Sequence, residues 1–154
     1  MRFFLLAMLI TISSSVGAAS PREAYTLSSE GKAVIVDVRE FEEISHGMIR
    51  DALWFPKSKM STDPEAVKSF KEIIDGKKVY LYCKSGKRAE ACQQILEGQG
   101  ISAESIGGFD TLKDVLPVEG LHQKLLRLRQ SSPTGSGRKN QKVSVAAVKD
   151  CLRH

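Results

Sequence analysis

The sequence predicts an α/β fold with a small, mainly parallel sheet flanked by helices on both faces. Residues 33–38 and 78–82 form continuous apolar runs, typical of strands that are buried on both sides. Helical patterns separate the strand-like segments, and strands that alternate with helices favour parallel pairing through crossover connections. The chain of 154 residues, 42% hydrophobic and 27% charged, is long enough for one soluble domain with its own core.

Helix start signals are clear in the first half of the chain. Ser20 is placed to cap a helix with Pro21 in its first turn, and Asp63 to cap another with Pro64 at its first position. The second helix carries apolar residues on one face, namely Val67, Phe70, Ile73 and Ile74. In order, this half is expected to contain helix 22–29, strand 33–38, helix 40–45, strand 53–55 and the helix after Asp63.

The second half continues the alternation. Gly98 and Gly100 end a helical pattern that begins near Arg88. A further amphipathic helix is expected over 121–130, with Leu121, Leu125 and Leu128 on one stripe. The expected elements are strand 78–82, helix 88–97, strand 103–106, helix 109–115 and helix 121–130.

Cys83 stands between a strand end and a helix start, the most informative position in the chain. Backbone N–H groups at such a junction are free, and the helix dipole there favours negative charge. Lys84, Lys87 and Arg88 follow within five positions and add positive charge. These effects stabilise a thiolate, the nucleophilic form of cysteine. The alternative is a buried structural cysteine, which needs neither Gly86 nor the cations.

Cys83, Gly86 and Arg88 together resemble the active-site loop of rhodanese-type sulfurtransferases, Cys-x-x-Gly-x-Arg. Three further segments resemble landmarks of that family, in the family's order. Residues 34–40 resemble its opening strand and turn, 46–52 its His-Ile-x-Gly-Ala segment with the residue order changed, and 107–109 its closing Gly-Gly-aromatic turn. The resemblance covers residues 20–120 and implies a rhodanese-like domain that works without a cofactor.

The resemblance also implies a chemistry. Cys83 would be the catalytic nucleophile, and the substrate would bind to Lys84, Ser85, Gly86, Lys87 and Arg88. Cys83 and Arg88 are separated by four residues, whereas the phosphatase-like relatives have five, so the loop resembles the sulfur-transferring kind. The implied reaction moves a sulfane sulfur from thiosulfate or a related anionic donor, through a persulfide on Cys83, to a thiol or cyanide acceptor.

Two other functions remain open at this point. The domain could be a non-catalytic, rhodanese-like module that binds a partner, in which case Cys83 would be dispensable. It could also be a thiol redox protein that uses Cys83 and Cys151, although Cys83 is not part of a Cys-x-x-Cys pair. Cys92 falls on the apolar face of helix 88–97, where a small core residue is expected.

Asp37 and Arg39 are expected to support the domain beneath the reactive loop, with Arg39 paired to Asp37 or Glu42. His46 is interpreted as structural, because a thiolate that is already stabilised needs no general base. Trp54 is expected in the core or in a pocket wall. No group of histidines, cysteines and carboxylates has the spacing of metal ligands, so neither a metal nor a cofactor is predicted.

Residues 1–19 have the layout of a secretory signal peptide, with a short apolar run and a small-residue exit at Ala19. We therefore expect an exported, periplasmic protein; an uncleaved anchor is the alternative. Residues 20–120 contain 14 basic and 17 acidic side chains, and residues 121–154 contain 8 and 1. The segment 131–154 is expected to be a flexible basic tail in weak contact with acidic surfaces, on a monomer that binds no nucleic acid.

Overall fold

The structure is a computed structural model, and it describes residues 18–130 of the chain. The predicted signal peptide, except for residues 18 and 19, lies outside the described residues. The predicted basic tail, with Cys151, also lies outside them. Between residues 18 and 130, no helix is long and apolar enough to cross a membrane.

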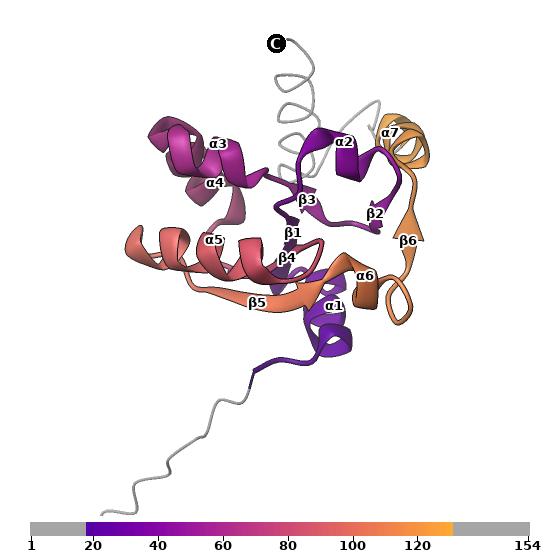
Figure 1. The fold of residues 1–154 in the computed structure, drawn as a ribbon, viewed down its shortest axis with the longest axis horizontal. Helices are drawn as coiled ribbons and strands as arrows, with labels where there is room; N and C mark the ends of the chain where they lie inside the picture. The colour runs from indigo at the N-terminus through magenta and orange to yellow at the C-terminus, as the bar shows by residue number, and fades with distance from the viewer. Residues whose placement is uncertain (1–17, 131–154) are drawn as a thin grey trace, which may run out of the picture.

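A four-stranded parallel sheet forms the centre of the fold (Figure 1). Its strands lie in the order β3-β1-β4-β5, with bounds Leu53–Trp54, Ala33–Asp37, Lys78–Cys83 and Ala103–Gly108. The predicted α/β class with a mainly parallel sheet is confirmed. A separate antiparallel pair joins β2 (Met48–Ile49) to β6 (Val118–Glu119), and the sequence did not predict it.

Helices cover both faces of the sheet, as the sequence predicted (Figure 1). One layer consists of α3 (Lys57–Thr62), α4 (Pro64–Ile74) and α5 (Lys87–Gly98), and the opposite layer of α1 (Pro21–Ser29) and α6 (Phe109–Leu112). Two helices lie outside these layers, α2 (Phe41–Ile44) and α7 (Leu121–Gln130). Helix α3 was not predicted, because its six residues have neither a capping side chain nor an apolar period.

The predicted helix caps are present. The Ser20 side chain accepts a hydrogen bond from the N–H of Glu23 at 3.2 Å, and the Asp63 carboxylate accepts one from the N–H of Ala66 at 2.9 Å. Each bond satisfies one of the N–H groups that a helix start leaves free. The two caps therefore begin α1 and α4 where the sequence placed them.

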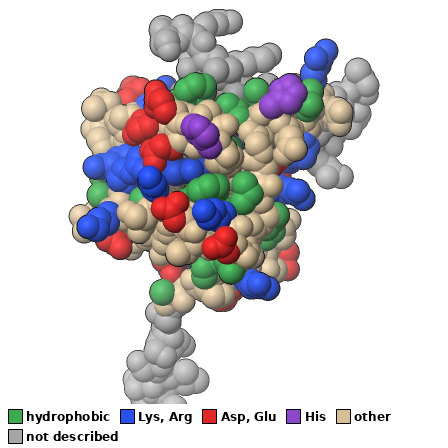
Figure 2. All heavy atoms as spheres, turned by 45° about the vertical axis from the view of Figure 1, so that its right-hand side comes forward, with side chains coloured by type: hydrophobic (Ala, Val, Ile, Leu, Met, Phe, Trp, Pro, Cys, Tyr) green, Lys and Arg blue, Asp and Glu red, His purple; other side chains and the backbone are tan. Residues whose placement is uncertain are grey.

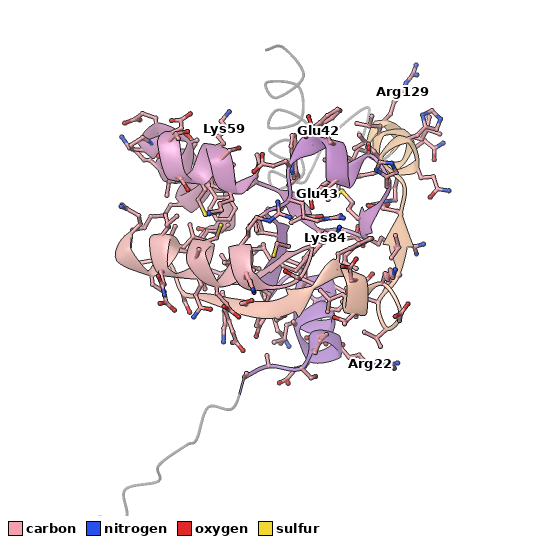
Figure 3. The ribbon with its side chains drawn as sticks, viewed as in Figure 1. Arg22, Glu42, Glu43, Lys59, Lys84 and Arg129 are labelled. Atoms are coloured by element: carbon pink, nitrogen blue, oxygen red, sulfur yellow. The ribbon has the colours of Figure 1, made fainter. Side chains whose placement is uncertain are left out.

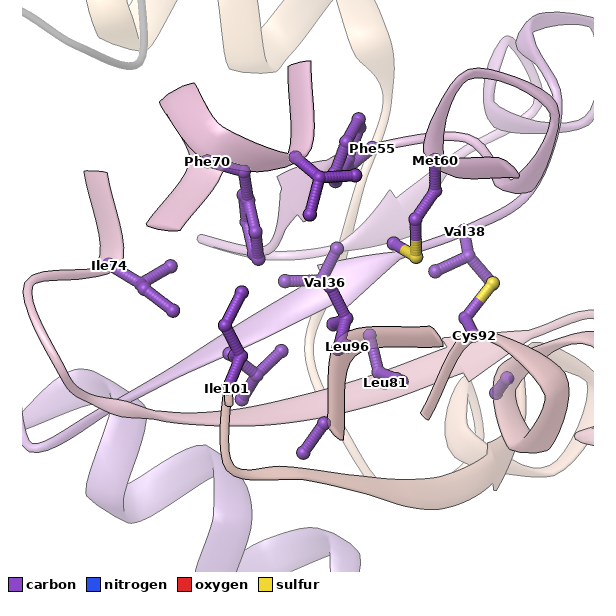
Figure 4. Close-up of a cluster of buried hydrophobic side chains, with 14 of the residues drawn as sticks. Val36, Val38, Phe55, Met60, Phe70, Ile74, Leu81, Cys92, Leu96 and Ile101 are labelled. Atoms are coloured by element: carbon purple, nitrogen blue, oxygen red, sulfur yellow. The ribbon is translucent and has the colours of Figure 1, made fainter. Parts of the chain in front are cut away.

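Alternation along the strands divides the core into two layers. In β4, Val79, Leu81 and Cys83 join the layer under α4 and α5, and Tyr80 and Tyr82 join the layer under α1 and α6. Figure 4 shows the first layer, with side chains from the sheet interdigitating with those of the helices above it. Because the side-chain period of a strand is two, this alternation directs Cys83 toward α5.

The predicted apolar stripe of α7 is confirmed only in part, because Leu121 and Leu128 are half-buried but Leu125 is not. Leu125 is 38% exposed, whereas Lys124 is only 5% exposed. The Lys124 ammonium group donates a hydrogen bond to the carbonyl of Ala52 and lies 3.6 Å from the carboxylate of Glu119. An ion pair and a backbone acceptor thus compensate the burial of this charge, and Lys124 lies on the same face of α7 as Leu121 and Leu128.

Candidate active site

Cys83 is the last residue of β4 and is 1% exposed. The N–H of Gly86, the N-cap residue of α5, donates a hydrogen bond to the Cys83 Sγ at 3.1 Å. Gly86 has a φ of 103°, a backbone conformation that glycine adopts without strain. The loop thus curls back toward its own thiol at the positive end of the α5 dipole, where negative charge on sulfur is stabilised.

The end of strand β5 packs directly against the backbone of the reactive loop. The register between β4 and β5 shifts after Leu81, so that Cys83 pairs with Gly108. At Gly108 an added Cβ would stand 2.7 Å from the Cα of Ser85 and would also collide with the carbonyl oxygen of Lys84. Gly108, the second glycine of the Gly-Gly pair, therefore lets two backbones approach more closely than any side chain would allow.

The five predicted substrate-binding residues lie together around Cys83 but differ in exposure. The side chains of Lys84, Ser85 and Lys87 are exposed, Gly86 is buried, and Arg88 is half-buried. No ion pair involves Lys84 or Lys87 in the part of the chain that the structure describes. These two lysines can therefore offer positive charge to an approaching anion.

Arg88 is engaged by a residue that the sequence analysis did not single out. Glu43 of α2 accepts two hydrogen bonds from the Arg88 guanidinium, each of 2.6 Å. Figure 3 shows Glu43 on the side of α2 that faces the loop of Lys84, with Glu42 farther from that loop. Glu43 also accepts the N–H of Glu40 at 3.2 Å, which completes a capping box. That local pattern was visible in the sequence, but its link to Arg88 was not.

The ion pair changes the electrostatics of the site. The bond to Arg88 is the main cause that lowers the pKa of Glu43 below its usual value, and it overcomes the opposing effect of partial burial. The bond to Glu43 is the main cause that raises the pKa of Arg88, and the nearby Cys83 contributes further. Arg88 thus lies between a carboxylate and the thiol, with its charge largely balanced by Glu43.

Asp37 and Arg39 form a buried pair beneath the site. Arg39 Nε lies 3.0 Å from both oxygens of the Asp37 carboxylate, and Arg39 Nη2 donates to one of them at 2.7 Å. Arg39 is 3% exposed and Asp37 is fully buried. Burial alone would lower the pKa of Arg39, but the bonds to Asp37 raise it instead. Of the two partners that the sequence suggested, Arg39 therefore uses Asp37 and not Glu42.

Arg39 also joins segments that are distant in the sequence. Its guanidinium lies 3.9 Å from the centre of the Phe109 ring, and its Nη2 donates to the carbonyl of Gly47 at 2.6 Å. The indole N–H of Trp54 donates to the carbonyl of Arg39 at 2.8 Å. This arginine joins the segment after α2, strand β3 and the start of α6, and so stabilises the structure around the loop.

Cys92 lies on α5 and is fully buried in the core layer that contains Cys83. Burial raises the pKa of the Cys92 thiol to about 11. A neutral, inaccessible thiol is a poor nucleophile, so Cys92 contributes packing rather than reactivity. The prediction that Cys92 is a core residue is confirmed.

His46 is exposed, and its ring nitrogen Nδ1 lies 3.0 Å from the carbonyl of Glu42. This contact belongs to the end of α2, so nothing in it connects the imidazole to the thiol of Cys83. Within residues 18–130, no group of three or more histidines, cysteines and carboxylates is arranged to hold a metal ion.

A parallel sheet with a cysteine loop between strand and helix defines an α/β protein with a cysteine-centred candidate site. Comparison with known families identifies it further: the profile of the rhodanese-like domain matches residues 20–114. The chain belongs to the rhodanese-like domain family.

Known relatives and solved structures agree with this membership. A tRNA uridine(34) hydroxylase of Bacillus pumilus is 32% identical over 103 residues, which cover 66% of this chain and 32% of that protein. The chain therefore spans about a third of the length of this curated relative. A structure from Staphylococcus saprophyticus is 29% identical, with a TM-score of 0.53 over 66% of this chain and 97% of the other. A rhodanese-like domain protein of Staphylococcus aureus is 26% identical, with a TM-score of 0.54 over 67% of this chain and 96% of the other.

Proposed function

We propose that the protein is a sulfurtransferase that carries a sulfane sulfur as a persulfide on Cys83. The observation that carries the proposal is the hydrogen bond of 3.1 Å from the Gly86 N–H to the Cys83 Sγ, at the start of α5. A loop that directs an N–H group at its own sulfur stabilises negative charge there, first on the thiolate and then on the persulfide.

The proposed sulfur transfer has two steps, formation of the Cys83 persulfide and release of its terminal sulfur. In the first, the Cys83 thiolate attacks the outer sulfur of the donor, an S–S bond forms, and the donor's own bond to that sulfur breaks with its electron pair. Thiosulfate would release sulfite, and a thiol persulfide would release a thiolate. In the second step, a thiolate or cyanide takes the terminal sulfur, and the Cys83 thiolate returns.

Access to the thiol requires a local opening. Cys83 is 1% exposed, so a donor cannot reach its Sγ unless a neighbouring group moves. Lys84 and Lys87 are exposed on the loop that follows Cys83, and they would attract the anionic donor. This loop, and not the likeness to the tRNA hydroxylases, supports sulfur transfer, because the chain spans only about a third of such a protein.

Intact-protein mass spectrometry tests the proposal directly. The reduced wild-type protein is incubated with thiosulfate or, separately, with glutathione persulfide, beside the variant Cys83→Ser. We expect the wild type to gain one sulfur atom with at least one donor and to lose it on addition of cyanide. The variant should gain none, and Cys92→Ala should behave like the wild type.

A wild type that gains no sulfur from either donor, with Cys83 shown to be reduced and open to alkylation, would contradict sulfur transfer. The partner-binding alternative would then be the better description of the domain. Sulfur loading that persists in Cys83→Ser would contradict the assignment of the nucleophile.

A further inference from the structure

The half-buried ion pair between Glu43 and Arg88 lies beside the nucleophile, and sulfur transfer as described above does not use it. Both hydrogen bonds measure 2.6 Å and form the fork-to-fork arrangement that holds a guanidinium firmly. The two side chains are 27% and 30% exposed, so solvent only partly screens the pair. Arg88 therefore presents far less positive charge to the site than a free arginine would.

Arg88 interacts with the reacting sulfur, although Lys84 and Lys87 lie nearer to Cys83 in the chain. It occupies the first turn of α5, and the nearby Cys83 contributes to the raised pKa of Arg88. Lys84 and Lys87 have exposed side chains. Water and salt screen exposed charges strongly, so these lysines attract an anion without holding it at the sulfur.

Two donor classes differ in the charge that they bring to this position. Thiosulfate is a dianion, and its leaving group, sulfite, is also a dianion. A thiol persulfide carries a single negative charge on its reacting sulfur atoms, and the sulfur that leaves is a thiolate with a single charge. Because Glu43 already balances the charge of Arg88, the site stabilises the second negative charge of thiosulfate less well.

Resting on the sulfurtransferase function proposed above, we propose that Glu43 sets donor preference by neutralising Arg88, which favours a thiol persulfide, singly charged at its reacting group, over thiosulfate. Glu43 is then a positioning residue that acts through Arg88 and does not touch the reacting atoms. Arg88 interacts with both Glu43 and Cys83. The positive charge that Glu43 leaves unbalanced on Arg88 therefore decides how strongly a dianion is repelled from the Cys83 thiolate.

Steady-state kinetics with both donors test this inference. For the wild type, kcat/KM should be at least about tenfold higher for glutathione persulfide than for thiosulfate. Glu43→Gln removes the negative charge and keeps an oxygen that can accept the N–H of Glu40. It should raise kcat/KM for thiosulfate about tenfold and change the value for the persulfide less than about threefold.

Two further variants separate charge from structure. Glu42→Gln makes the same change of charge on a neighbouring exposed residue of α2 and should leave the ratio of the two donors unchanged. Glu43→Asp retains the charge and should keep the wild-type preference. Thermal unfolding of each variant shows whether the domain stays folded.

The outcomes distinguish this inference from the proposed function. If Glu43→Gln leaves the donor ratio unchanged, or lowers both values in proportion, Glu43 is only a structural partner and the inference is overturned. An equal change of ratio in Glu42→Gln would also overturn it, because net charge alone would then explain the effect. Failure of both donors to load Cys83 in the wild type would overturn the proposed function itself.

Discussion

Gly108 lies against the backbone of Ser85, so closely that a Cβ atom on the glycine would stand 2.7 Å from the Ser85 Cα. Real side chains essentially never come this near to a backbone atom, so one of the two segments would have to move. The reactive loop follows β4 directly, and β5 is the strand that pairs with it there. The shape of the active site is thus set partly from a strand that carries no reactive group.

Gly108→Ala should displace the loop and lower kcat/KM for sulfur transfer by at least about tenfold, because small misplacements of reacting groups are costly. The overpacked methyl group should also destabilise the domain by about 1–3 kcal/mol. Donor kinetics and urea unfolding measure the two effects. Gly98→Ala is the matched control, since a Cβ there meets no atom within 4 Å; an equal loss of activity in both variants would contradict the argument.

Asp37→Asn should be strongly destabilising. The substitution leaves the 3% exposed Arg39 guanidinium without its carboxylate partner, and breaking a buried pair in this way typically costs about 3–5 kcal/mol. Urea unfolding followed by circular dichroism gives the change. Glu30→Gln breaks the exposed Lys32–Glu30 pair and should cost less than about 1 kcal/mol. Similar losses for the two variants would show that Arg39 is not held as tightly as the geometry indicates.

Lys84→Ala and Lys87→Ala should weaken the use of an anionic donor chiefly through binding. Each variant should raise KM by about threefold to tenfold and alter kcat less, because these exposed charges attract the donor before the chemical step. Added salt should reduce the difference from the wild type. Lys68→Ala, on an exposed position of α4, serves as the control. An unchanged KM in both loop variants would indicate a donor without net charge.

The free energy of unfolding should fall in acid. The bond to Arg88 lowers the pKa of Glu43, and for Glu119 the opposing effect of burial is overcome by Arg127 and Lys124, which lower its pKa below the usual 4.5. As the pH falls, these two carboxylates therefore take up protons in the unfolded state before they do so in the folded state. Stability from these carboxylates is fully present above pH 4.5 and is lost as the pH falls through their lowered pKa values.

Equilibrium unfolding between about pH 3 and pH 7 measures this dependence. Glu119→Gln should be less stable than the wild type at neutral pH and should show a shallower acid slope. Parallel curves for the two proteins would mean that Glu119 gains nothing from its contacts with Arg127 and Lys124.

Local signals in the sequence were sufficient for the main elements of the fold. Ser20 and Asp63 cap helices through hydrogen bonds that span three residues, so the chain itself carries the information. The buried strands β1 and β4 were predicted from continuous apolar runs, and the position of Cys83 between strand and helix follows from them. The six residues of the reactive loop are contiguous in the chain, which is why their gathering around one thiol is predictable from local sequence.

The sequence by itself thus determined the α/β class, the helix caps and the cysteine loop. Only the tertiary structure decided the Glu43–Arg88 pair, whose partners are 45 residues apart, the burial of Lys124, and the close approach of Gly108 to Ser85. The physical reason is range. Caps and strand patterns depend on neighbours within a few residues, whereas these contacts depend on how α2, α7 and β5 are oriented by a core drawn from the whole domain.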